Sequence, residues 1–248
     1  MIKSVFNTVV YEPLYNGLVF LVDVLPGHDV GFAIIVLTLF IKFALFPISR
    51  QAVRTQIAMR EVAPEIEAIK EKYKDKQEEQ ARAIFALYRE KNIRPFSSFF
   101  LILLQLPILF GLYWVFWRGG LPVVDPELLY AFVRIPEAVD MHFLGVIDMS
   151  GRSALLAALA GASQLVYARL SMGPRKPPPK DGAKRSFGDD MARSFDIQMR
   201  YVLPVVIAVI SYTLSAAVPL YWATSNIFMI AQELLMGRRF SAAAQPKS

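Results

Sequence analysis

The chain has 248 residues, of which 55% are hydrophobic and 19% are charged, and its mean hydropathy is +0.40. Soluble domains seldom combine so large an apolar fraction with so few charges, so the composition favours a membrane protein. The absence of cysteine excludes disulfides, thiolate catalysis and Cys-ligated zinc. The net charge is +6, and in a membrane protein basic cytoplasmic loops that face anionic lipids explain such a charge better than binding to nucleic acid.

The N-terminal residues 1–29 are predicted to form an interfacial amphipathic helix on the outer face of the membrane. The stretch is a poor signal peptide, because no small-residue cleavage site follows it and polar residues interrupt its apolar run. A spanning helix would bury these polar residues in lipid, whereas an interfacial helix leaves them at the headgroups. The interfacial interpretation is favoured, and a span over 5–25 is the alternative. The interrupting residues are Asn7, Glu12, Asn16 and Asp23.

Five apolar segments are each close to the length that a helix needs to cross a hydrocarbon core of about 30 Å. Their runs lack polar alternation, which favours helices over barrel strands. The predicted fold class is therefore all-α, a polytopic membrane protein with a five-helix transmembrane core. The predicted spans are residues 30–48, 97–117, 153–171, 201–216 and 218–236.

Lys and Arg set the orientation of these spans. Residues 49–96 hold 11 of them, residues 172–200 hold seven and the tail 237–248 holds three, whereas residues 118–151 hold two. Five spans place the three basic segments on one side, which the positive-inside rule assigns to the cytoplasm. We therefore expect a cytoplasmic C-terminus and an extra-cytoplasmic loop at 118–152.

Two segments that we expect in the cytoplasm have distinct sequence patterns. Residues 49–96 are predicted to form a helical hairpin that turns at 74–77, and a hairpin packed only on itself and one that docks partners both fit the pattern. The loop 172–200 is rich in proline and charge and is predicted to be mobile. Apolar positions recur at helical spacing in both arms of the hairpin, at Ile66, Ile69 and Tyr73 and at Ala81, Ile84 and Tyr88.

Lys42 is the most informative residue in the sequence, because it lies inside the first predicted span. On a straight helix it would be roughly 12 Å from the cytoplasmic end. A cation in mid-membrane costs on the order of 3 kcal/mol. Two explanations stay open: snorkelling of the ammonium to the headgroups, and a water-filled cavity open to the cytoplasm. The cavity is favoured.

Polar residues in at least four of the five spans strengthen the case for a cavity. Thr38 precedes Lys42 by one helical turn on the same face. Each residue alone is more often a helix–helix hydrogen bond than a site, but together they could line one hydrophilic hollow. The others are Gln105, Gln164, Trp222, Thr224, Ser225 and Asn226. Enzyme signatures for zinc proteases, serine hydrolases and P-loop proteins are absent, so we expect neither catalysis, nor a cofactor, nor a metal.

Four ordered motifs resemble the YidC, mitochondrial oxidase-assembly and chloroplast Albino insertases, in a short form without a large extra-cytoplasmic domain. The second and fourth motifs are the specific ones, and the resemblance covers nearly the whole chain. The motifs are I-I-V-L-T-L-F-I-K-F-A-L-F-P at 34–47, A-P-E-I-E-A-I-K-E-K-Y at 63–73, Q-L-P-I-L-F-G-L-Y at 105–113 and L-Y-W-A-T-S-N-I-F-M-I-A-Q at 220–232.

The resemblance implies a membrane protein insertase and chaperone of the cytoplasmic (inner) membrane. Such proteins take hydrophobic segments of newly made proteins into a groove that is open to the cytoplasm and closed to the outside. Lys42 matches the groove's positive charge, although most relatives have Arg there, and Thr38, Gln164 and Trp222 match its polar and aromatic positions. Nascent membrane proteins and membrane lipids are the implied partners, with the ribosome and the Sec translocon as further candidates, and no nucleic-acid readout is expected.

A small transporter or channel is the alternative, in which the same polar residues line a solute path. It predicts polar groups that reach both faces and, often, an internal repeat. No convincing repeat is found, and Lys42 and Thr38 lie in the cytoplasmic half of their predicted span. The insertase interpretation is therefore favoured.

Overall fold

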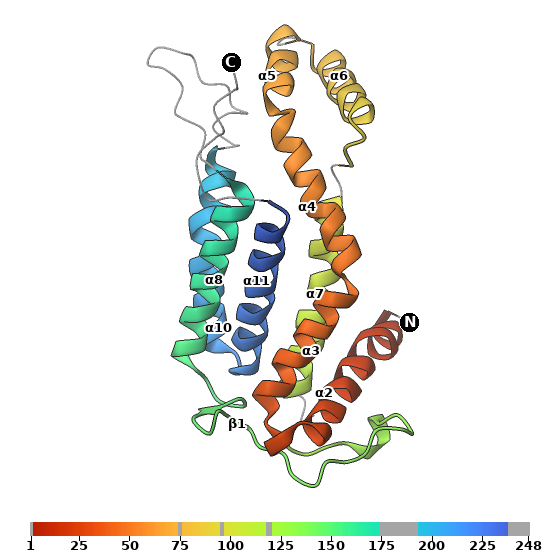
Figure 1. Cartoon of the computed structure of the whole chain (residues 1–248), viewed down its shortest axis with the longest axis vertical. Coiled ribbons are helices and arrows are strands. Elements are labelled where there is room, and N and C mark those ends of the chain that lie inside the picture. Colours follow the sequence, from red (N-terminus) through yellow and green to blue (C-terminus); the bar gives the residue numbers. More distant parts are fainter. Residues whose placement is uncertain (1, 74–75, 95–96, 118–120, 174–192, 238–248) are drawn as a thin grey trace. The chain divides into compact units, whose positions relative to one another are not determined.

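A computed structural model describes residues 2–73, 76–94, 97–117, 121–173 and 193–237 (Figure 1). The chain divides into two compact units, one of Met1–Lys42 with Ile108–Ser248 and one of Phe43–Pro107. Most of the predicted loop at 172–200 and of the tail at 237–248 lies outside the described residues, as do two residues of the turn at 74–77.

Helices of membrane-spanning length confirm the predicted class, an all-α polytopic membrane protein. Among the described residues, Ser4–Val24, Ala154–Met172 and Arg193–Thr213 are long and apolar enough to cross, and the broken pair Val30–Ala44 and Phe46–Glu61 adds a fourth candidate. Gln105–Phe116 is apolar but shorter. The five-helix core stays a prediction, and so does the interfacial placement of residues 1–29, since Ser4–Val24 meets the requirements of a span.

The N-terminal helices of the first unit pack around one apolar core. Helix α1 (Ile2–Phe6) continues through a π-helical turn, Asn7–Tyr11, into α2 (Glu12–Val24), and α3 (Val30–Ala44) follows. The last ten residues of α7 (Ser97–Trp117) belong to the same unit. Their buried side chains form one cluster, which includes Leu18, Val22, Ala33, Ile34, Leu112 and Val115.

The loop after α7 is tied to α2 by Asn16. Its Nδ2 donates to the carbonyl oxygen of Leu128 at 2.8 Å and to that of Glu12 at 2.9 Å, and its Oδ1 accepts from the backbone N–H of Tyr130 at 2.6 Å. Only 2% of Asn16 is exposed. The polar side chain of Asn16 is therefore satisfied by backbone groups of the loop and of its own helix.

The same loop continues to the other helices of the unit. It contains a 3₁₀ turn (Pro126–Leu128) and a small antiparallel hairpin of β1 (His142–Phe143) and β2 (Ile147–Asp148). Ser153 then caps α8 (Ala154–Met172) by accepting from the Leu156 N–H at 3.2 Å. The loop is therefore bonded to α2 through Asn16 and leads into the capped start of α8.

Helix α8 packs against both α10 (Leu203–Thr213) and α11 (Ala217–Leu235), as Figure 1 shows. A π-helical turn, Gln198–Val202, leads into α10. Within it, Arg200 is buried and donates to the Gly173 carbonyl and to Asp196 Oδ1, each at 2.8 Å. The hydrogen bond to Gly173, the C-cap of α8, fixes the end of α8 to the turn that leads into α10.

Gly161 allows α8 and α10 to approach closely. A Cβ at this position would lie 2.7 Å from the Ala208 Cβ and 3.0 Å from the Pro204 carbonyl oxygen. Small residues at membrane helix interfaces permit such contacts. Gly161 is therefore a position on α8 where an added side chain would collide with α10.

Gly161→Leu is expected to destabilise the protein by about 1–3 kcal/mol, because the new side chain must push α10 away. Thermal unfolding of the purified protein in detergent measures this loss. Ala158→Leu, at an exposed position of α8, is the matched control and should leave the melting temperature nearly unchanged. Equal melting temperatures for the two variants would contradict the close packing.

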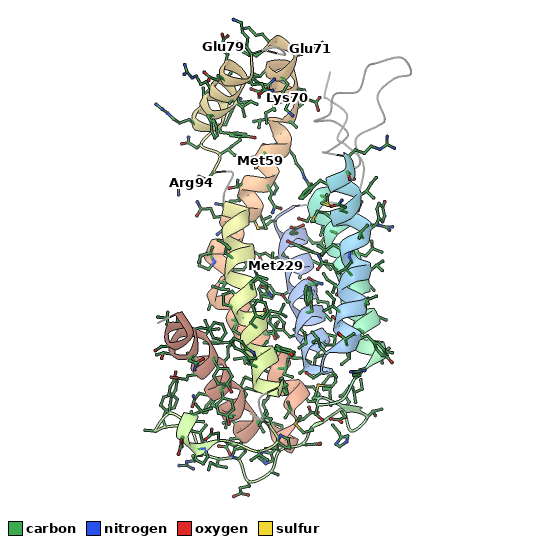
Figure 2. The ribbon with its side chains drawn as sticks, turned by 180° about the vertical axis from the view of Figure 1, so that it is seen from behind. Met59, Lys70, Glu71, Glu79, Arg94 and Met229 are labelled. Atoms are coloured by element: carbon green, nitrogen blue, oxygen red, sulfur yellow. The ribbon has the colours of Figure 1, made fainter. Side chains whose placement is uncertain are left out.

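The second unit consists of α4 (Phe46–Glu61), α5 (Ala63–Lys72), α6 (Gln77–Glu90) and the first part of α7. Arms α5 and α6 pack on each other, and a small core of Val62, Leu87 and Ile93 lies beneath them, with the predicted apolar positions Ile66, Ile69 and Tyr88 against it. Figure 2 shows the charged side chains of Lys70, Glu71 and Glu79 toward the hairpin's tip and Arg94 toward its base.

One helix boundary differs from the expected span at 30–48. Helix α3 ends at Ala44, and α4 begins at Phe46 with Pro47 in its first turn. Proline lacks an N–H and its ring clashes with the carbonyl four residues earlier, so it is tolerated at a helix start but not in a helix interior. The proline rule therefore explains why the helix breaks at Leu45, and the predicted span at 30–48 includes this break.

Candidate functional site

Lys42 is held in the last turn of α3, on the helix face that is buried. Ile34, Thr38 and Lys42 recur at intervals of four residues on that face, and only 9% of Lys42 is exposed. Because α3 ends two residues later, Lys42 lies closer to its helix end than the roughly 12 Å expected for a straight helix. A cation in the last turn is favoured by the helix dipole.

Thr38 lies one turn before Lys42 and is almost fully buried, with 1% of its surface exposed. Its Oγ1 donates to the Ile34 carbonyl oxygen at 2.6 Å. This bond within the helix satisfies the hydroxyl proton and leaves the oxygen lone pairs as acceptors. Thr38 can therefore accept a hydrogen bond without exposing a donor of its own.

A second polar group joins α8 to α11. The indole Nε1–H of Trp222 donates to Gln164 Oε1 at 3.3 Å. One turn further along α11, Asn226 Nδ2 donates to Ser163 Oγ at 3.2 Å, and Ser163 Oγ donates to the Ala160 carbonyl at 2.9 Å. Two successive residues of α8 thus meet two residues of α11 that lie one turn apart.

The six predicted site residues therefore fall into three places. Thr38 and Lys42 share one face of α3, and Gln164, Trp222 and Asn226 form the contact between α8 and α11. Gln105 lies on α7 within the second unit, and it is half-buried.

Ser163 is a member of the α8–α11 group that the sequence did not single out. A serine in a span rich in Ala and Gly is usually a small packing residue, so no local signal separates it from its neighbours. Gln232 and Glu233, 2% and 0% exposed on α11, were also outside the predicted set. Both are polar residues in an apolar helix, and this contrast in the sequence could have added them to the predicted site residues.

Trp222→Phe is expected to lower stability by about 1 kcal/mol, because it keeps the ring but removes the donor to Gln164. Removing both partners in Trp222→Phe/Gln164→Leu should cost less than the sum of the two single changes. A double-mutant cycle on thermal unfolding measures this coupling. Strict additivity would show that the hydrogen bond contributes nothing.

Among the described residues, no group of three or more His, Asp or Glu is placed to hold a metal ion. The described site residues provide a buried cation, hydroxyl acceptors and amide groups on apolar helices. Such groups can attract and hydrogen-bond a polar or acidic segment inside the membrane.

Comparison with known proteins decides the family. The family described as "60Kd inner membrane protein" matches residues 21–243 of this chain. The chain belongs to this family. Together with its apolar helices, membership identifies a multi-pass protein of the inner membrane.

Curated members of the family carry the name "Membrane protein insertase YidC". The Clostridium tetani protein is 33% identical over 210 residues, which is 85% of this chain and 82% of that protein. A Neisseria meningitidis serogroup B protein is 29% identical over 84% of this chain but only 33% of its own length, and a Stutzerimonas stutzeri protein is 27% identical over 87% and 34%. This chain thus spans about a third of the longer relatives.

Proposed function

We propose that this chain is a membrane protein insertase and chaperone. It receives hydrophobic segments of newly synthesised proteins in a hydrophilic groove open to the cytoplasm and releases them into the lipid bilayer. The observation that carries the proposal is Lys42, a cation buried on an apolar helix in a chain whose family members are named insertases.

In the first unit, the proposed groove residues are Lys42 and Thr38 from α3, Gln164 from α8, and Trp222 and Asn226 from α11. Gln105 is the proposed substrate-contacting residue of the second unit. Burial of Lys42 supports a site enclosed by protein over simple snorkelling, because a snorkelling stem lies along lipid with its ammonium in the headgroups. The polar contact between α8 and α11 supplies amide groups at membrane depth. Lys42 supplies the charge that attracts acidic substrate segments.

Closure on the outer side is supported by the loop between α7 and α8. In addition to Asn16, the N–H of Ala216 donates to the Gly151 carbonyl at 2.8 Å and that of Ala217 to the Met149 carbonyl at 3.3 Å, just before and at the start of α11. The loop is thereby bonded to α2 and α11, and it leads directly into α8. The basic hairpin, the loop 172–200 and the C-terminus lie in the cytoplasm in this proposal.

The proposed mechanism needs no catalytic step and no cofactor. Moving an acidic or polar stretch through lipid is costly, and a wet, positively charged groove shortens that path. The substrate's apolar segment then partitions sideways into the bilayer. Nascent membrane proteins and lipids are the partners, and the ribosome and the Sec translocon are candidates for delivery.

Depletion of the protein tests the proposal directly. Insertion of small one-span and two-span substrates should fail without it and return when the intact chain is supplied. Normal insertion in depleted membranes that hold no paralogue would overturn the proposal. The transporter or channel alternative is not favoured, because it accounts for neither the insertase-named relatives nor the bonded outer loop.

The groove itself can be mapped with single cysteines, since the chain has none of its own. Water-soluble thiol reagents should label Thr38→Cys and Asn226→Cys from the cytoplasm only. Phe40→Cys is the matched control, because Phe40 is 69% exposed on an apolar helix and should face lipid, out of reach of the reagent. Labelling of Thr38→Cys from both sides would favour a channel.

A further inference from the structure

The base of the hairpin holds an open pocket of about 490 Å³, wholly within the second unit. It is lined by Arg54 from α4, Arg89 from the last turn of α6 and Arg94 from the segment after α6, and all three are exposed. Thr55 and Ile93, both buried, lie among the lining residues. Three arginines and two buried residues therefore line the same hollow.

A tight helix ending brings two of these arginines to the pocket. Helix α6 ends at Glu90, and Asn92 follows in the left-handed conformation with φ 52°. The Ile93 N–H donates to the Tyr88 carbonyl at 2.8 Å and the Asn92 N–H to the Arg89 carbonyl at 3.3 Å, which is a Schellman ending. The chain reverses there, so that Arg94 returns beside Arg89 while Ile93 enters the hairpin core.

The charge of this pocket is one-sided. None of its lining residues is a carboxylate. Outside the pocket, Lys91 pairs with Glu65 of α5 at 3.2 Å. Arginine forms two parallel hydrogen bonds to a phosphate, and three arginines around one hollow are suited to a phosphate group.

The chain positions of these arginines indicate where the phosphate comes from. Arg94 lies three residues before α7 begins at Ser97, and Arg54 lies ten residues after α3 ends at Ala44, which is about 15 Å of helix. In the proposed topology both points are at the cytoplasmic surface of the membrane, near the depth of lipid headgroups. Anionic lipids are the phosphate source concentrated there.

We propose that this pocket binds the phosphate headgroup of an anionic phospholipid from the cytoplasmic leaflet. The bound headgroup would hold the base of the hairpin against the membrane surface. The inference rests on the proposed topology and goes beyond insertase activity, since the lipid is neither substrate nor product.

Lipid binding by the purified full-length chain in a neutral detergent tests this. Native mass spectrometry counts bound molecules as short-chain phosphatidylglycerol is added, with phosphatidylcholine as the zwitterionic comparison. We expect one saturable phosphatidylglycerol site and at least about tenfold weaker binding in Arg54→Gln/Arg89→Gln/Arg94→Gln, because charge-assisted hydrogen bonds are lost. The three single variants give the same measurement, with smaller losses, if the triple variant does not fold.

The matched control is Lys70→Gln/Lys72→Gln/Arg82→Gln, which removes the same charge from the hairpin outside the pocket. It should bind phosphatidylglycerol like the unmodified chain. Equal losses in both triple variants would overturn the proposal in favour of a diffuse charge effect. No loss in either would overturn the pocket assignment.

Two further probes separate the sources of the anion. If inorganic phosphate binds at the three arginines as tightly as phosphatidylglycerol, the pocket is a site for free phosphate and the lipid proposal is overturned. An acidic peptide that displaces phosphatidylglycerol at lower concentration would assign the pocket to a protein partner, and would overturn the proposal. Because no substrate protein is present, the result is independent of whether the chain inserts proteins.

Discussion

Lys42→Ala is expected to lower the insertion of substrates with acidic outer segments by about tenfold, whereas Lys42→Arg retains it. At an effective dielectric constant of about 20, a carboxylate about 6 Å from the ammonium gains roughly 3 kcal/mol. Loss of half of that interaction energy lowers the affinity for the acidic segment by about tenfold. Arg keeps the charge and adds a bidentate fork for the carboxylate.

Insertion assays with matched substrates measure this effect. A substrate whose acidic residues are changed to the corresponding amides should lose its dependence on Lys42. Lys42→Met keeps the length of the stem and removes the charge, so it should resemble Lys42→Ala and separates charge from side-chain volume. Equal activity of the Lys, Arg, Met and Ala forms would leave snorkelling as the only role of Lys42.

Asp29→Ala is expected to have the largest effect on stability, about 2–4 kcal/mol, because one buried carboxylate holds two elements. Its Oδ1 accepts from the Gly31 N–H at 2.7 Å and the Phe32 N–H at 3.2 Å, which caps α3. Its Oδ2 accepts from the Leu144 N–H of the outer loop at 3.0 Å. Removal of the side chain leaves three backbone donors without this acceptor.

Thermal unfolding in detergent and protease sensitivity from the outer side measure the consequence. Asp29→Asn keeps an oxygen acceptor and should lose less stability than Asp29→Ala. Glu137→Ala removes one negative charge from an exposed position of the same loop and should behave like the unmodified chain. An Asp29→Ala protein as stable and as protease-resistant as Glu137→Ala would show that the loop is held by its apolar contacts alone.

The fold class could be predicted from sequence because it depends on local hydropathy. A run of apolar residues must be a helix in lipid whatever its neighbours are, since only then are its backbone groups satisfied. The apolar spacing of Ile66, Ile69 and Tyr88 likewise places them against the hairpin core. The break between α3 and α4 follows from the same kind of local rule, because Pro47 is tolerated at a helix start but not in a helix interior.

Residues of the candidate site could be predicted from sequence only where a polar or charged residue stands out in an otherwise apolar helix. Lys42 is such a residue, and the structure places it on a buried face. The Gln164–Trp222 contact joins positions 58 residues apart in sequence, and Ser163 joins it without any local signal. Hydrogen bonds between spans depend on which helix faces meet, which no single segment encodes.

The sequence by itself determined that this protein is a helical membrane protein with a cation inside its first apolar segment, because burial of a charge and exposure of backbone are costly in any arrangement. Only the tertiary structure decided what the polar residues contact. Asn16 binds the backbone of Leu128 and Tyr130, and Arg54 lines one pocket with Arg89 and Arg94. Both outcomes depend on partners far along the chain, which become neighbours only when it folds.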